Sequence, residues 1–392
     1  MKHYYLDENY GRKLTLPASV PAAHAQALQA LMRQKELALL LIVEADEGGY
    51  RQWLTGMATL ERFSAGGIIV PSEGPVWLIT GNTLPETEQS ETYRVQTHTN
   101  PYSFHQSNGF CQQTLDRLLA EKKRIGTVHG QKMRTALHTF LTQTLGCELI
   151  DVTMDAERCK MKKLSAEREA MRLAAQQTTR LFSSAQGIFE PGMTLREACV
   201  ELRRCAYRLG CFGADDGISS GLSLQVYPGK DTPEHEPVLH ESDCIGLRAC
   251  CVWDDARYGI GARVFALDKE LPAALRTLWN AACEAQRAAA HAIRPGVSLQ
   301  TAAGAANRAL RACGCCTDTS RFLFAIGCAR QERPFLLDES ETWPLEEGTV
   351  LAIAPTAALP SGQRLCCADL FEITADGCVP LVPLCQEPML LR

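Results

Sequence analysis

Three aspartates and three cysteines fall within one β-rich stretch of the chain, ESDCIGLRACCVWDDARYGIGARVF. Carboxylates bind hard divalent cations and thiolates bind softer metals, so these residue types could form a metal site. Their positions argue against one. Asp243 lies in a polar turn, where we expect it to face solvent, and Asp254 and Asp255 lie at the tip of a hairpin. Cys250 and Cys251 are neighbours on a strand and therefore point to opposite faces. The stretch predicts no metal site of its own.

Cysteines are frequent elsewhere too: the chain has 18, and only Cys111 precedes residue 147. The densest group, C-G-C-C, contains a C-x-x-C pair formed by Cys313 and Cys316. A zinc site would need a second such pair or suitably spaced histidines, and neither follows. We interpret the cysteines as small buried residues of a protein in a reducing compartment, with a redox or zinc role as the alternative.

The composition indicates a globular protein with no affinity for nucleic acid or membranes. Of 392 residues, 46% are hydrophobic and 22% charged, and the net charge is −5 with a pI near 6.0. The sequence has no basic run that would bind nucleic acid, and no apolar run near the roughly 20 residues that span a bilayer. The polar N-terminus MKHYYLDENYGRK is not a signal peptide, so we expect a cytoplasmic protein.

The first 150 residues alternate between helix and strand patterns. A helix is predicted over 19–37 and a buried strand over 38–44. The runs GGIIV and VWLIT flank the turn PSEG and predict a hairpin. Helices at about 111–123 and 131–144 are separated by the strand IGTV, and CELIDVT reads as a last strand. This order is typical of a compact α/β domain.

The rest of the chain contains an internal duplication. A long helix is predicted from Ser165 to the Pro-Gly pair that opens residues 191–210, PGMTLREACVELRRCAYRLG. Residues 295–314, PGVSLQTAAGAANRALRACG, have the same length, with Pro-Gly at the start and Gly at the end. Thr194 starts the first copy with a capping box and Ser298 places a hydroxyl cap on the second. We expect two similar halves that pack as one pseudo-symmetric domain with a ligand cleft between them.

Taken in order, several short motifs resemble the creatinase/aminopeptidase P family. RQWLTG, CKMKKLSAEREAMRLAA, RPGVSL, GARVF, EEGTVLAIAP and ADGC each resemble a segment of that family, across nearly the whole chain. The resemblance implies an α/β and α+β protein with two domains. We expect a creatinase-like N-terminal domain over residues 1–153 and a pita-bread domain of the catalytic type over residues 154–392. It also implies a two-fold homodimer.

Active members of that family hold two divalent metals with two Asp, one His and two Glu. We transferred each ligand position of the family to this chain through the neighbouring motif. The second Asp then corresponds to Ile260, or to Gly259 if the register shifts by one residue. The first Asp corresponds to Ala249, or to Arg248 in the shifted register. The His position is Phe324 and the two Glu positions are Ala354 and Ala368. None of these side chains ligates a divalent metal, so we expect a metal-free protein without a cofactor.

Other side chains at the border of the expected cleft are polar, and the resemblance places there Arg263, Tyr258, Tyr227, Arg330 and Glu332. Arginines and tyrosines around a dry pocket suit a carboxylate ligand, which could be a small molecule or a peptide. We expect Arg263 in particular to face the cleft and to be free for such a ligand, because the two glutamates of the family are alanines here.

Three functions are compatible with these residues. The first is a pseudo-enzyme that binds a small molecule or peptide in the former catalytic cleft. The second is a metal-independent hydrolase of a C–N bond that uses other catalytic residues, although the sequence has no G-x-S-x-G motif and no neighbouring Cys–His pair. The third is a metallopeptidase whose ligands lie elsewhere in the sequence.

Overall fold

The computed structural model describes residues 16–43, 47–56, 65–80, 93–97, 124–211, 221–227, 238–253, 257–268 and 270–390. Contacts divide these residues into two compact units, 16–160 and 161–390. The first unit extends to Lys160, because helix α5 (Thr153–Met161) packs on it. There the Tyr50 hydroxyl donates to Glu157 Oε1 at 2.6 Å. No helix in the described ranges is long and apolar enough to cross a membrane.

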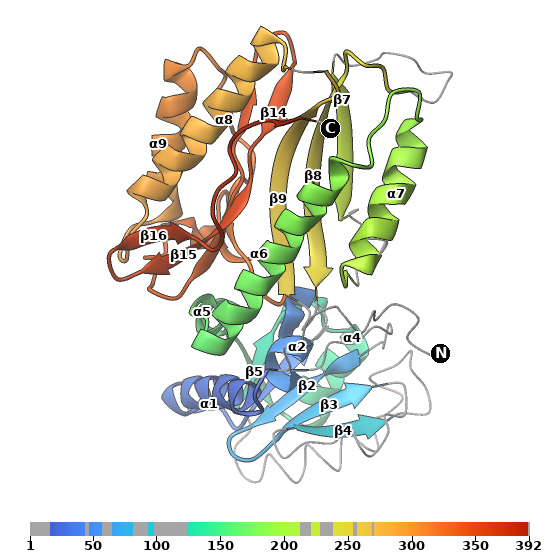
Figure 1. Cartoon of the computed structure of the whole chain (residues 1–392). Helices are drawn as coiled ribbons and strands as arrows, with labels where there is room; N and C mark the ends of the chain where they lie inside the picture. The colour runs from blue at the N-terminus through green and yellow to red at the C-terminus, as the bar shows by residue number, and fades with distance from the viewer. Residues whose placement is uncertain are drawn as a thin grey trace. The chain divides into compact units, whose positions relative to one another are not determined.

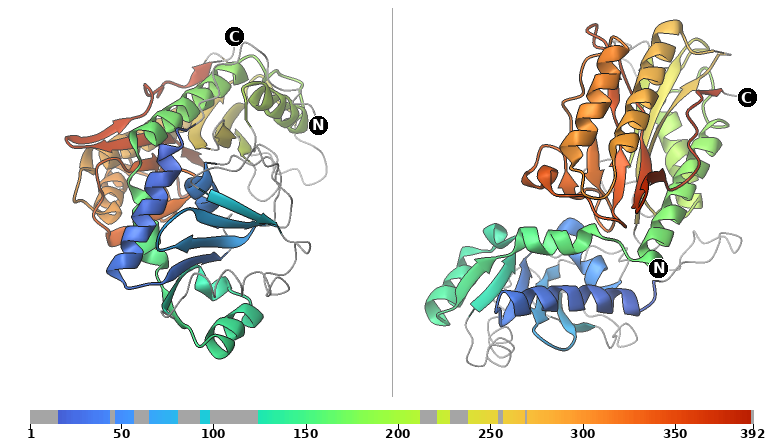
Figure 2. Two further views of the ribbon diagram at one scale, coloured as in Figure 1. Left: turned by 90° about the horizontal axis from the view of Figure 1, so that it is seen from below. Right: turned by 90° about the vertical axis from the view of Figure 1, so that its left-hand side faces the viewer.

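The N-terminal unit is a mixed sheet in the order β4-β3-β2-β1-β5-β6, with α1 along one side (Figure 2). Its elements are α1 (Ser19–Gln34), β1 (Leu39–Val43), α2 (Tyr50–Thr55), β2 (Ala65–Pro71), β3 (Val76–Thr80), β4 (Tyr93–Thr97), β5 (Arg124–Val128), α4 (Thr135–Thr139) and β6 (Glu148–Asp151). The predicted hairpin is the antiparallel pair β2–β3. The predicted helix at 131–144 begins only at Thr135 and continues as a π-helical segment, Phe140–Thr144. The helix expected at 111–123 lies outside the described residues.

The C-terminal unit consists of two halves, each a pair of helices and a sheet (Figure 1). The first half contains α6 (Ser165–Ala185), α7 (Leu195–Arg208), β7 (Leu222–Tyr227), β8 (Cys244–Trp253) and β9 (Arg257–Ala266), with the short β17 (Met389–Leu390) beside β9. The second half contains α8 (Ala273–Ala292), α9 (Leu299–Ala312), β10 (Leu323–Ala325), β11 (Glu332–Phe335), β12 (Val350–Ile353), β15 (Asp369–Thr374) and β16 (Gly377–Pro380), with the hairpin β13 (Thr356–Ala358) and β14 (Arg364–Cys366).

The predicted duplication is confirmed by helices α7 and α9, which have the same length and occupy equivalent positions in the two copies. Thr194 forms the expected capping box, in which its hydroxyl accepts from Glu197 N at 3.2 Å. Ser298 is the N-cap of α9, but its side chain bonds no backbone N–H of the helix. Its hydroxyl lies 3.4 Å from the hydroxyl of Thr301. Helices α8 and α9 lie side by side over the strands of their half (Figure 2, right).

Close packing of α6 on β9 is made possible by two glycines. A Cβ at Gly259 would lie 2.1 Å from Thr178 Oγ1, and one at Gly261 would lie 2.5 Å from the Phe182 ring. With no side chains there, Trp253 Nε1 reaches Thr178 Oγ1 at 2.9 Å. The helix therefore lies directly on the strand that leads to the cleft.

Three apolar clusters form the core of the C-terminal unit. One joins α8 and α9 to the second sheet, and one joins α6 and α7 to the first sheet. The third lies between the two sheets and reaches the cleft.

All seventeen described cysteines are free thiols, of which eight are buried. The expectation of small buried cysteines is wrong for Cys313, Cys316 and Cys385, which are exposed.

Candidate functional site

A cavity of about 370 Å³ lies in the C-terminal unit, where the first sheet meets the loops of the second half. Its floor is apolar and consists of buried side chains, Ile260, Phe322, Phe324 and Ala354. Its rim is polar and comes from β7, β8, the segment before β10 and the loop before β11. The volume lies near the lower end of the roughly 300–1,000 Å³ of small-molecule sites.

Four of the five positions expected to correspond to metal ligands meet in the third apolar cluster: Ile260, Phe324, Ala354 and Ala368. The first three line the cavity. Their side chains carry no oxygen, nitrogen or sulfur, so they cannot ligate a divalent ion. Within the described ranges, no group of three or more His, Cys, Asp and Glu side chains could hold a metal ion. The described residues at these positions therefore do not fit a dinuclear metal centre.

The fifth position, Ala249, does not face the cavity. Cys250, not Ala249, lies opposite Ile260 in the antiparallel ladder between β8 and β9. Paired residues point to the same face and neighbours to opposite faces. Ala249 accordingly packs in the cluster under α6 and α7 and is fully buried, whereas Cys250 and Arg248 line the cavity. Of the two alternatives that the sequence offered on this strand, Arg248 therefore faces the cavity and Ala249 faces away from it.

The carboxylate of Asp243 was also misjudged. We expected it to face solvent, but only 3% of the residue is exposed. Its Oδ2 accepts from His240 N at 2.8 Å, so it closes the turn before β8. The other two acids of that stretch, Asp254 and Asp255, lie outside the described residues.

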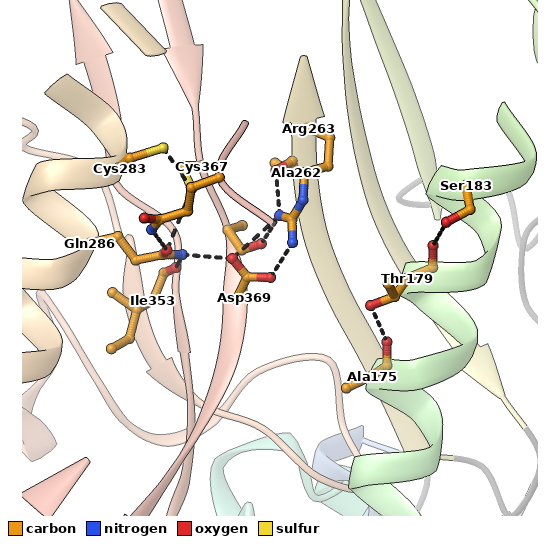
Figure 3. A network of polar contacts seen from close by, with 12 residues as sticks. Ala175, Thr179, Ser183, Ala262, Arg263, Cys283, Gln286, Ile353, Cys367 and Asp369 are labelled. Carbon is orange, nitrogen blue, oxygen red and sulfur yellow. Dashed lines mark hydrogen bonds and ion pairs between the residues drawn. The ribbon is translucent and has the colours of Figure 1, made fainter. Parts of the chain in front are cut away.

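The expectation of a free Arg263 is wrong. Its guanidinium is buried, with 3% exposed, and forms a two-pronged ion pair with Asp369 at 2.6 Å and 3.3 Å (Figure 3). Arg263 also donates to the carbonyls of Ala262 and Ala368 at 2.8 Å and 3.1 Å. A buried guanidinium needs an anionic partner, and Asp369 at the start of β15 supplies it. Arg263 therefore joins β9 to β15 and does not line the cavity.

Asp369 has a second donor on the opposite side. Gln286 Nε2 of α8 donates to Asp369 Oδ2 at 3.1 Å and to Ile353 O at 3.0 Å (Figure 3). The thiols of Cys283 and Cys367 continue this network, with their sulfurs 3.7 Å apart. Burial raises the pKa of Asp369, and the hydrogen bonds from Arg263 and Gln286 work in the opposite direction. The network ties the two sheets together, and it commits the guanidinium of Arg263 to Asp369 and two backbone carbonyls.

Glu332 is likewise held by the protein. It is 2% exposed, and its Oε2 lies 2.5 Å from the Nζ of the buried Lys163. Its Oε1 accepts from Ala329 N at 3.0 Å. Glu332 thereby fixes the loop that carries Arg330 and Gln331 to the rim of the cavity, and it does not line the cavity itself.

The two predicted tyrosines do not line the cavity. The Tyr227 hydroxyl donates to Arg364 O, and burial raises the pKa of Tyr227 above its ordinary value. Tyr258 is half-buried and packs on the edge of the third apolar cluster. Of the five side chains expected to bind a ligand, only Arg330 lines the cavity.

Sequence reasoning missed most of the rim. Arg321, Ser320 and Thr356 line it but belong to no family motif. They are brought together by Asp318, which is 8% exposed and whose carboxylate accepts from Ser320 N and Thr356 N at 2.8 Å each. The only sequence signal for this arrangement is the polar run TDTS before an apolar strand. An Asp in such a run commonly accepts hydrogen bonds from nearby backbone amides and closes a turn.

Three arginines therefore surround the cavity: Arg248, Arg321 and Arg330, all of them exposed. Arg321 stacks on the Phe335 ring at 4.3 Å. Within the described part of the chain, none of the three makes an ion pair, and no acidic side chain lines the cavity. The site is a cationic rim over an apolar floor.

Comparison with known proteins agrees with this architecture. The sequence model of metallopeptidase family M24 matches residues 169–375, and that of the creatinase/prolidase N-terminal domain matches residues 25–162. A comparison with curated proteins finds no significant match.

Several solved structures share the fold over nearly the whole chain. Dipeptidase PepE from Mycobacterium ulcerans is 20% identical with a TM-score of 0.73, over 95% of this chain and 98% of that one. The X-Pro aminopeptidase from Thermotoga maritima is 17% identical with a TM-score of 0.76, over 93% and 99%. The Xaa-Pro dipeptidase from Bacillus anthracis is 16% identical with a TM-score of 0.76, over 95% and 100%. These likenesses confirm the predicted N-terminal α/β domain and pita-bread domain.

Proposed function

This chain belongs to metallopeptidase family M24, with a creatinase/prolidase N-terminal domain, and we propose that it works without metals as a binding protein for a small anionic molecule. The observation that carries the proposal is the composition of the cavity. Three arginines stand at its rim, no described acid faces it, and its floor is apolar at three positions where the family resemblance places metal ligands.

A carboxylate is the ligand that such a rim recognises best. Guanidinium groups form two parallel hydrogen bonds to a carboxylate, and charge-assisted bonds of this kind are about twice as strong as neutral ones. Ser223, Ser320 and Thr356 add hydroxyls that can donate to the same anion. The cavity volume of about 370 Å³ favours a small molecule, or the carboxyl end of a short peptide, over a larger partner.

No observation favours the metal-independent hydrolase that the sequence left as an alternative. Hydrolysis needs a group that activates water or an activated nucleophile. The described residues that line the cavity include no His, Asp or Glu. The neighbouring carboxylates, Glu332 and Asp369, are committed to Lys163 and Arg263.

The test is a direct binding measurement combined with metal analysis of the purified protein. Titration calorimetry with a panel of small carboxylates should detect binding that weakens with salt, since the contacts are electrostatic. Arg330→Ala and Arg248→Ala should each weaken it, whereas Arg294→Ala, which removes an exposed arginine away from the cavity, should not. Stoichiometric zinc, manganese or cobalt bound with high affinity would overturn the proposal, as would indifference of both arginine variants.

We further propose that the protein forms a two-fold dimer and works in the cytoplasm. Seventeen free cysteines among the described residues suit a reducing compartment. A closed two-fold dimer is the commonest oligomer and the usual assembly implied by the family resemblance.

A further inference from the structure

The cavity has two chemically different ends, and from them we infer a narrower ligand class: a small organic dianion with an apolar body, such as an aryl- or alkyl-substituted dicarboxylate. This inference rests on the proposed anion-binding function and specifies the anion. The apolar body would lie on the floor and the two acidic groups at the rim.

The first argument is charge matching at the rim. Arg248, Arg321 and Arg330 bring three positive charges to one small cavity, although the whole chain has a net charge of −5. A single carboxylate would offset one of these charges and leave two arginines without an anion. A second negative charge on the ligand would offset another, because opposite charges attract and like charges around one cavity repel one another.

The second argument is the chemistry of the floor. Ile260, Phe324 and Ala354 are each at most 4% exposed and offer only carbon to the cavity. A charged or strongly polar group placed on them would lose its water without gaining a hydrogen bond, which costs free energy. Hydrocarbon placed there gains free energy through burial. A dicarboxylate without an apolar portion would therefore make no use of the apolar floor.

The third argument is that the rim is built in advance of binding. Two buried carboxylates hold the segments that carry two of the arginines. Asp318 ties Ser320, next to Arg321, to Thr356, and Glu332 ties the loop before Arg330 to Lys163. A pre-organised site loses less conformational entropy when it binds, so it can discriminate between small ligands.

The experiment compares three probes that differ in one property each: benzylsuccinate, a dianion with an aryl body; succinate, a dianion without one; and 3-phenylpropionate, an aryl monoanion. We expect benzylsuccinate to bind at least about tenfold more tightly than either of the others, because each lacks either one charge-assisted contact or the buried ring. Cys250 lines the cavity and provides a second readout. Bound benzylsuccinate should slow its alkylation by iodoacetamide, followed by peptide mass spectrometry, but not that of the exposed Cys385.

Variants separate the two levels of the hypothesis. Arg330→Ala should reduce the preference for benzylsuccinate over 3-phenylpropionate to about threefold or less, and Arg294→Ala should leave it unchanged. Equal affinity for all three probes, still dependent on Arg330, would refute the dianion inference while the anion-binding function stands. Absence of binding by all three, with no protection of Cys250, would refute both.

Discussion

The ion pair between Arg263 and Asp369 yields the sharpest stability prediction. Both residues are buried, with 3% and 4% exposed, and they join β9 of one half to β15 of the other. Asp369→Asn keeps the shape of the side chain but removes its charge. Arg263 then keeps its bonds to two backbone carbonyls but has no anion.

Leaving a buried charge unpaired costs about 3–5 kcal/mol of unfolding free energy. Arg263→Met should cost less than Asp369→Asn. Asp369 would retain the hydrogen bond from Gln286 and, since burial raises its pKa, could take up a proton and become neutral. The double variant Arg263→Met/Asp369→Leu should recover most of the loss, because well-packed apolar residues often replace a buried pair without penalty.

Urea unfolding measures these differences, and hydrogen exchange by mass spectrometry locates them. Exchange should accelerate in peptides from β9 and β15 and remain unchanged in β1 and β5 of the N-terminal unit. Glu270→Gln is the matched control, because it breaks the exposed pair of Glu270 with Arg276, whose atoms lie 3.5 Å apart, and should not shift the unfolding midpoint.

Two results would refute the reasoning. The first is a loss below about 1 kcal/mol for Asp369→Asn, which is the range of an exposed pair rather than a buried one. The second is a double variant as unstable as the sum of the two single variants, which would mean that the residues contribute independently.

Three further predictions concern packing, pH and assembly. Gly259→Ala should destabilise the protein by about 1–3 kcal/mol in urea unfolding, because the new methyl group would lie 2.1 Å from Thr178 Oγ1. Gly187→Ala is the control, because a methyl group there would lie 3.8 Å from its nearest neighbour, Ser184 O. Burial raises the pKa of the Cys328 thiol to about 11, so between pH 9 and 11 the unfolded chain releases a proton that the folded chain retains. The unfolding free energy should fall there by about 1.4 kcal/mol per pH unit for this thiol, and Cys328→Ala should flatten the slope. Light scattering at micromolar concentration should give twice the 43.1 kDa of one chain, and a monomer would contradict the proposed dimer.

Much of the fold could be predicted because its signals are local. Helices α7 and α9 follow from Pro-Gly starts, hydroxyl N-caps and glycine ends, which lie within twenty residues of one another in each copy. The glycines that end them, Gly210 and Gly314, have φ values of 92° and 74°, a conformation that glycine adopts without strain. These signals agree with the helical spacing of the apolar residues, and together they identified both copies of the duplicated helix.

The candidate site could be predicted only in part, because it depends on pairings between distant segments. That Cys250 lies opposite Ile260 at the cavity was not predicted, because the register of a hairpin depends on its loop length. Ala249 was reached by carrying over a spacing, whereas the ladder pairs Cys250 with Ile260. The partner of Arg263 lies 106 residues away in the sequence, and no local pattern indicates that Asp369 reaches it.

The cavity is positively charged because the neighbouring carboxylates bind donors of the protein and do not pair with the arginines at its rim. Asp318, Glu332 and Asp369 all lie near it, yet each points to protein donors: two backbone amides, Lys163 and Arg263 respectively. Their charges are thus neutralised or screened within the fold, while the exposed arginines face no carboxylate among the described residues that line the cavity. A chain with a net charge of −5 can in this way present a local anion site. The same carboxylates hold the segments that carry Arg321 and Arg330, so the interactions that stabilise the second half also create the binding potential of the cleft.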